Sequence, residues 1–150
     1  MFLGIFDSQT LDILQRIVFA VVLGAIVGIE REFAHKTAGM RTHALVSVGS
    51  ALFSIVSSAF SGPNADPSRI AAQIVTGIGF IGAGLIIFQQ QKIQGLTTAA
   101  GVWAVAAIGM ACGFALYSVA VLGALSIIVI FVILWPIEHF IEKIRDKTEK

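Results

Sequence analysis

The chain has 150 residues, of which 57% are hydrophobic and only 13% are charged, and its net charge is +1. Because roughly a quarter of the residues in soluble domains are charged, this composition excludes an ordinary soluble protein. It equally excludes a disordered chain and a nucleic-acid-binding protein, and it leaves one hydrophobic domain that belongs in a membrane.

The spacing of the charges indicates how many helices cross the bilayer. No formal charge occurs in residues 44–65, 70–91 or 93–137. Since a helix needs about 20 apolar residues to cross the hydrocarbon, the first two stretches hold one span each. The third is long enough for two spans, with a reversal near Gly109–Gly113. With the apolar run near the N-terminus, the chain has five predicted spans, near Leu11–Ile29, Thr42–Phe60, Ile70–Phe88, Thr98–Ala111 and Phe114–Trp135.

We therefore predict an all-α membrane protein. A five-helix transmembrane domain covers residues 1–136, and a short amphipathic, charged tail over residues 137–150 lies on the cytoplasmic interface or pairs with another subunit. Lysine and arginine in short loops favour the cytoplasmic side. With the N-terminus outside, eight of the ten basic residues fall inside and only Arg16 and Arg69 fall outside. The predicted C-terminus is cytoplasmic.

The connection after the first predicted span is the most polar part of the sequence. Glu30 and Arg41 border the hydrocarbon at the two sides of a short hairpin, so we expect them to pair. Polar residues at this depth are costly and often functional, although a solvated loop with ordinary orientation charges also explains them. We call the following residues the loop cluster: Glu30, Arg31, Glu32, Arg41, Thr42 and His43.

A second polar group precedes and begins the third predicted span. Asp66 is well placed as the N-cap of that helix, and this role alone explains it. Arg69 and Gln73 are four residues apart and share one helical face. Because Gln73 then enters the membrane below a positive charge, we expect it to hydrogen-bond to another helix.

Glycines are concentrated in the third predicted span. Residues 77–82 form a literal G-x-G-x-x-G, but they lie inside an apolar run with no acidic residue following, which excludes a dinucleotide-binding loop. We predict instead close helix contacts, or places where a helix bends or unwinds. The glycines assigned to this role are Gly24, Gly28, Gly77, Gly79, Gly82, Gly84 and Gly101.

Two threonines begin the fourth predicted span. Thr97 and Thr98 are expected to cap that helix, although their hydroxyls and the free N–H groups could equally bind an anion or a polar substrate group. Small residues follow them, so we expect this helix to be central in the bundle. Cys112, the one cysteine, is interpreted as a small apolar residue.

Four segments carry a family resemblance. GIERE at 28–32, AGMRTH at 38–43, DPSRIAAQIVTGIGFIGAG at 66–84 and GLTTAAGVWAVAAIG at 95–109 resemble the successive motifs of the MgtC/SapB family of bacterial inner-membrane proteins. The resemblance implies a five-span protein linked to growth under magnesium limitation and, in pathogens, to survival inside host phagocytes. It assigns the characteristic polar positions to Glu30, Arg31, Glu32, Arg41, Asp66, Arg69, Gln73, Thr97 and Thr98.

The resemblance favours a non-catalytic modulator of other membrane machinery. It implies a membrane-protein partner such as ATP synthase, and the glycine-rich helix faces favour a homo-oligomer surrounded by membrane lipid. The alternative is a small channel or transporter for a cation such as Mg²⁺, for which Glu30 and Glu32 are the candidate ligands. No other cofactor is expected, and an enzyme is not expected because no known catalytic motif is present.

Many family members continue after the last span into a soluble cytoplasmic domain. The printed sequence ends at Lys150 after a short charged tail. We therefore expect the membrane part to work alone or through partners.

Overall fold

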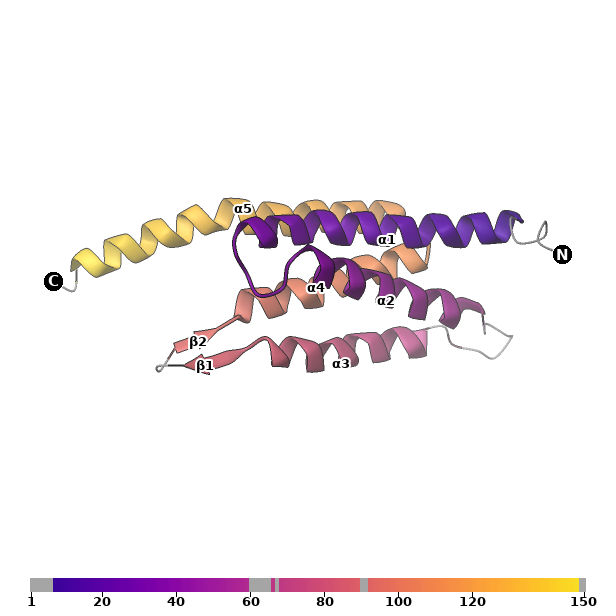
Figure 1. The fold of residues 1–150 in the computed structure, drawn as a ribbon, viewed down its shortest axis with the longest axis horizontal. Coiled ribbons are helices and arrows are strands. Elements are labelled where there is room, and N and C mark those ends of the chain that lie inside the picture. Colours follow the sequence, from indigo (N-terminus) through magenta and orange to yellow (C-terminus); the bar gives the residue numbers. More distant parts are fainter. Residues whose placement is uncertain (1–6, 60–65, 67, 90–91, 149–150) are drawn as a thin grey trace.

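The computed structural model describes residues 7–59, 66, 68–89 and 92–148. Helices that run alternately in opposite directions lie side by side, and a short two-stranded ribbon interrupts them after the third (Figure 1). In chain order the elements are α1 (Ser8–Phe33), α2 (Met40–Ala59), α3 (Ser68–Gly84), β1 (Ile87–Gln89), β2 (Lys92–Gln94), α4 (Leu96–Gly113) and α5 (Tyr117–Thr148). This architecture confirms the all-α class.

Four of these helices are long and apolar enough to cross a membrane. They are α1, α2, α4 and the part of α5 from Tyr117 to Ile137. The chain is therefore a multi-pass membrane protein. The remaining helix, α3, has only 17 residues. Among the described residues, the number of helices long and apolar enough to cross is therefore four, one fewer than the five predicted.

The third predicted span, Ile70–Phe88, is wrong beyond Gly84. The helix ends there, and the antiparallel ribbon pairs Phe88 with Ile93. Gly95 then leads into α4 with φ of +87°, and a Cβ at this position would collide with the carbonyl oxygen of Leu85. Glycine avoids both the strain of positive φ and this collision, which explains how the chain can leave β2 and enter α4 in close contact with Leu85.

The other helix boundaries differ from the predictions by a few residues, and one reversal is displaced. The turn between α4 and α5 lies at Ala115, with φ of +58°, and not at Gly109–Gly113. Those glycines are helical instead: a Cβ at Gly109 would collide with the backbone of Ser47 on α2. They bring α4 against α2, which is why the turn comes later. Of the second predicted span, Phe60 lies outside the described residues.

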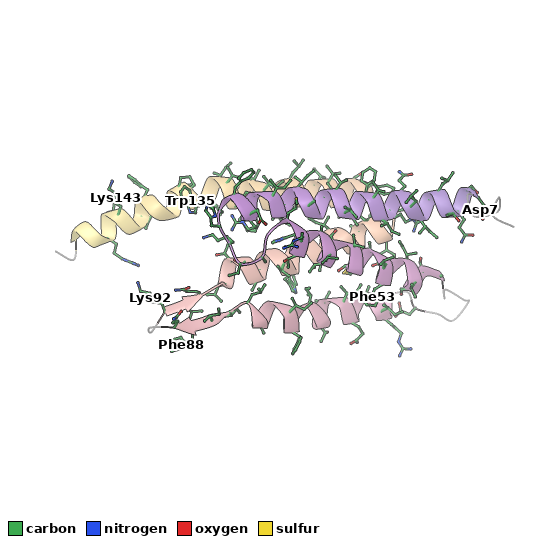
Figure 2. The ribbon with its side chains drawn as sticks, in the orientation of Figure 1. Asp7, Phe53, Phe88, Lys92, Trp135 and Lys143 are labelled. Atoms are coloured by element: carbon green, nitrogen blue, oxygen red, sulfur yellow. The ribbon has the colours of Figure 1, made fainter. Side chains whose placement is uncertain are left out.

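As far as Thr148, the predicted tail over residues 137–150 is a direct continuation of the last span. α5 runs through Pro136 and continues to Thr148, so that it projects beyond the other helices (Figure 1). Figure 2 shows Lys143 on this projection, at the same end of the bundle as Lys92 of the ribbon and opposite to Asp7. The basic residues Lys92 and Lys143 thus lie at one end of the bundle, and the start of α1 lies at the other end.

The core is centred on α4, which packs against α1, α2, α3 and α5. Cys112 is fully buried there, in agreement with its interpretation as a small apolar residue. A larger apolar cluster joins α1, α2, α4 and α5, and a smaller one joins α3 to α4 through Ile78, Val102 and Ala106. α3 is thus attached to the bundle mainly through α4.

Candidate functional site

The loop cluster lies where α1 ends and α2 begins. Arg31 is only 3% exposed, and its Nη2 donates to Glu30 Oε1 over 2.7 Å while its Nε donates to Glu30 Oε2. The carboxylate and the guanidinium therefore form a two-bond ion pair on the last turn of α1. The predicted pairing of Glu30 with Arg41 is wrong, because the adjacent arginine already occupies both carboxylate oxygens.

An aromatic ring from α5 completes the environment of Arg31. The guanidinium carbon lies 3.6 Å from the centre of the Phe131 ring, a cation–π contact. A Cβ at Gly101 on α4 would come within 2.7 Å of Phe131 Cζ, so glycine provides the space for this ring. Sequence reasoning missed Phe131 because nothing distinguishes one aromatic residue within a long apolar run.

Glu32 serves the next helix instead of a neighbouring cation. Its Oε2 accepts the backbone N–H of Met40 over 3.1 Å at the start of α2. Gly39 leaves room for this contact, because a Cβ there would occupy the position of the Glu32 carboxylate. A negative charge at a helix N-terminus is favourable, so Glu32 connects the end of α1 to the beginning of α2.

His43 is fully buried on α2. Its Nδ1 lies 2.9 Å from the carbonyl oxygen of Gly39, while Nε2 has no hydrogen-bond partner among the described residues. Ser47, one turn further on the same helix, is also fully buried, and its hydroxyl likewise lacks a partner in the described part of the chain. Thr42 is half-buried, whereas Arg41 is exposed and forms no ion pair with any described residue.

The two threonines of α4 do not cap it. The N-cap is Gly95, which offers no side chain, and the predicted cap is therefore wrong. Thr98 is 4% exposed and faces the interior, and Thr97 is exposed. Gly101 lies one turn after Thr98, and a Cβ at Gly101 would be 3.6 Å from His43 Nε2. Thr98 therefore belongs to the same end of the interior as His43.

The second polar group lies at the opposite end of the bundle. Asp66 Oδ1 accepts the backbone N–H of Ser68 over 2.9 Å, which confirms the predicted cap of α3. Hydrogen bonds from Ser68, assisted by the charge of Arg69, hold the pKa of the Asp66 carboxyl below its usual value. Arg69 and Gln73 are exposed, and Gln73 makes no hydrogen bond to another helix in the described structure.

The glycines assigned to helix contacts fall into two groups. A Cβ at Gly24 would lie 2.7 Å from Ser47 Cβ, and one at Gly28 would lie 2.6 Å from Met40 Cα, so these two permit close contact of α1 with α2. Gly82 is in ordinary contact with Ala99. Added Cβ atoms at Gly77, Gly79 and Gly84 would meet nothing within 4 Å, and α3 is helical throughout, without an unwound segment.

One polar contact at the far end was not predicted. Arg16 Nη1 donates to the carbonyl oxygen of Gly113 over 2.9 Å, and its Nη2 lies 2.5 Å from Asp12 Oδ2. The i, i+4 spacing of Asp12 and Arg16 was the available signal. Arg16 thereby satisfies a carbonyl at the C-terminus of α4, where a positive charge is favourable.

The candidate Mg²⁺ ligands stay a prediction. Within the described ranges, no three His, Cys, Asp or Glu side chains gather into a metal-binding group. Glu30 and Glu32 each accept hydrogen bonds from the chain itself. The structure therefore brings together the loop cluster, Thr98 and Gly101, and it separates them from Asp66, Arg69 and Gln73.

Comparison with known proteins gives a consistent result. Residues 17–140 match the MgtC family. The chain is 43% identical to the "Putative magnesium transporter YhiD" of Escherichia coli (strain K12) over 129 residues, covering 81% of this chain and 60% of that protein. It is 46% identical to "Protein MgtC" of Brucella abortus (strain 2308) over 123 residues, covering 82% and 51%.

A third relative is "Protein MgtC" of Salmonella typhimurium (strain 14028s / SGSC 2262), 51% identical over 94 residues, covering 63% of this chain and 40% of that protein. The chain thus spans between about two fifths and three fifths of the length of these relatives. No solved structure matches it significantly.

Proposed function

This chain belongs to the MgtC family, and we propose that it supports adaptation to low magnesium as a non-catalytic modulator of other membrane machinery. The observation that carries this proposal is the state of the loop cluster. Both of its acids are engaged by donors of the same chain, Glu30 by Arg31 and Glu32 by the backbone of Met40. Carboxylates that accept hydrogen bonds within the chain fix the local structure and are less available as ligands for a transported cation.

The exposed part of the same cluster is suited to recognition. Arg41 lies at the start of α2, exposed and without an ion pair among the described residues. The helix ends beneath it are fixed by the Glu32 contact and by the Arg31 stack on Phe131. An exposed, unpaired guanidinium on a fixed helix end can bind an acidic group of a partner, and a partner such as ATP synthase remains part of this proposal.

The proposal includes five spans in a bacterial cytoplasmic membrane, with the N-terminus outside. α3 has 17 residues and is about 25 Å long, which is the lower limit for a crossing helix. If α3 crosses, the first connection, the ribbon with Lys92 and the end of α5 with Lys143 all face the cytoplasm, as the positive-inside rule favours. A homo-oligomer through exposed small residues of α3 is part of the same proposal.

A second candidate function is a cation channel, which one observation supports. With the exception of Ala51, the buried residues of α2 are all polar: His43, Ser47, Ser50, Ser54 and Ser57. Buried polar residues in a membrane helix often mark an ion pathway, and one relative carries the name of a magnesium transporter. Ser54 already donates to the carbonyl oxygen of Ser50, so this face is partly satisfied within the helix.

A growth assay tests the modulator directly. In cells that depend on this protein at low magnesium, Arg41→Ala is expected to abolish growth while the protein still inserts at its normal level. Lys92→Ala is the matched control, since Lys92 is also an exposed cation at the same end, and it is expected to grow normally. Normal growth of Arg41→Ala would remove Arg41 from the proposed recognition surface.

A flux assay separates the two candidates. Purified protein in vesicles that contain a magnesium-sensitive dye is expected to give no flux above empty vesicles. Saturable flux that is lost in Ser47→Val, a change confined to the polar face of α2, would instead establish the channel.

A further inference from the structure

A groove lies between α2 and α3. It has a volume of about 520 Å³, within the range of ligand sites, and its walls are mostly apolar. Gly49 of α2 and Gly77 of α3 both line it, and a Cβ at either would meet nothing within 4 Å. Phe53 lines the groove on α2, and Figure 2 shows it near the end of that helix. The groove is open because each wall contributes a glycine.

Two polar side chains line this apolar groove without partners. Ser50 is only 4% exposed, and its hydroxyl makes no hydrogen bond to the described residues. The Gln73 amide lines the same groove and is exposed, with no hydrogen bond to the described residues. Because an unsatisfied polar group in a bilayer is costly, an occupant that can hydrogen-bond within this otherwise apolar space is favoured.

A charge lies beside the groove in sequence, because Arg69 directly precedes Ile70, the first residue of α3 that lines it. Arg69 precedes Gln73 by one helical turn, about 6 Å along the axis, and it is exposed without an ion pair among the described residues. Asp66 lies near it, since the Arg69 backbone N–H donates to the Asp66 carbonyl oxygen over 3.3 Å. From the end of α3 inward, the groups are therefore a cation, a hydrogen-bonding amide and an apolar groove.

We propose that this groove binds one membrane phospholipid. Its phosphate lies at Arg69, a glycerol ester carbonyl accepts from the Gln73 amide, and one acyl chain fills the groove past Gly77. The order of anion, polar ester and hydrocarbon in a phospholipid matches the order of the groups on α3. A transmembrane helix matches less well, because it is about 10–12 Å across.

Native mass spectrometry tests the proposal. The protein is reconstituted in vesicles of phosphatidylethanolamine and phosphatidylglycerol, extracted, and examined for retained phospholipid. The wild type is expected to retain one phospholipid per chain. Gly77→Leu fills the groove and is expected to lower retention about tenfold, and Gln73→Leu about fivefold through the loss of one hydrogen bond.

The matched control is Gly79→Leu. Gly79 lies on the same helix with equally open surroundings, but it does not line the groove, so its retention is expected to equal that of the wild type. Gly49→Leu fills the groove from α2 and repeats the test if Gly77→Leu does not fold, as judged by circular dichroism.

Two results would overturn the proposal. One is unchanged lipid retention in folded Gly77→Leu and Gly49→Leu. The other is a loss of the proposed homo-oligomer in these variants with lipid retention unchanged, which would assign the groove to a second copy of the chain. Neither result depends on growth at low magnesium, so this proposal and the proposed function fail separately.

Discussion

Glycine marks two regions of this bundle, with opposite surroundings. Where α1 meets α2, a Cβ at Gly28 would lie 2.6 Å from the backbone at Met40. Along α3, an added Cβ at Gly77 or Gly79 would meet nothing within 4 Å. The first glycine is required by the packing of the chain on itself. The others are not, so any reason for glycine there lies in what surrounds the chain.

The two regions also differ in how closely their helices pack. Within a bilayer, helices associate through close packing, not through the exclusion of water. Close contact of α1 with α2 therefore fixes Arg31, Glu32 and His43 in one arrangement. α3 is attached through the smaller cluster around Ile78 and leaves a groove beside α2. We infer that the first region provides rigidity and the second provides room.

The sharpest test of this comparison is one substitution made in both regions. Gly28→Ala is expected to destabilise the protein by about 1–3 kcal/mol, because the new methyl group forces backbone atoms apart. Gly79→Ala is expected to stabilise it by up to about 1 kcal/mol, since alanine favours the helix and nothing obstructs its methyl group. Thermal unfolding in detergent micelles measures both changes.

Equal effects of the two alanines would break the comparison. A stable Gly28→Ala would mean that α1 and α2 can separate at little cost, and the loop cluster would then lack a rigid base. A destabilised Gly79→Ala would mean that the outer face of α3 is already filled by another copy of the chain.

A smaller effect is expected from the ring that supports Arg31. Phe131→Leu keeps an apolar side chain of similar length but removes the cation–π contact, and it is expected to cost about 1 kcal/mol. Phe80→Leu is the control, since Phe80 on α3 is 86% exposed and its loss is expected to change the unfolding temperature little. The same shift in both variants would show that the Arg31 stack adds nothing beyond aromatic bulk.

Much of the tightly packed region could be predicted from the sequence. Helix length and apolar runs gave α1, α2 and α4 to within a few residues, and the spacing of Gly24 and Gly28 indicated a close contact. The pairing of Glu30 was misjudged because charges on facing helix ends looked like natural partners. The guanidinium of Arg31 is closer, and that depends on the path of one side chain.

The region around α3 was harder to predict for a physical reason. Residues 85–88 are as apolar as the helix before them, so periodicity and length could not show that the chain turns into a ribbon there. Gly95 permits the chain to pass from the ribbon into α4. The need for glycine there becomes visible only when the neighbouring Leu85 is known, because an added Cβ would collide with it. Likewise, nothing in the spacing of Gly77 distinguishes a contact from a groove. Three-dimensional neighbours decide both, and these come from parts of the chain distant in sequence.

The smallest effect is expected at the cap of α3, and it depends on pH. Asp66 has a lowered pKa in the folded protein because its charged form accepts from Ser68. Its stabilising contribution is therefore present above the ordinary aspartate pKa of 3.8 and is lost as the pH falls through the lowered value. Hydrogen exchange at the Ser68 amide is expected to be faster in Asp66→Ala than in the wild type near neutral pH, with the two rates converging in acid.

Asp7→Ala removes the equivalent cap of α1, which accepts from Thr10. Because α1 is longer and α3 has fewer neighbours, the Asp66 variant should loosen its helix more, and the reverse order would contradict the weaker attachment of α3.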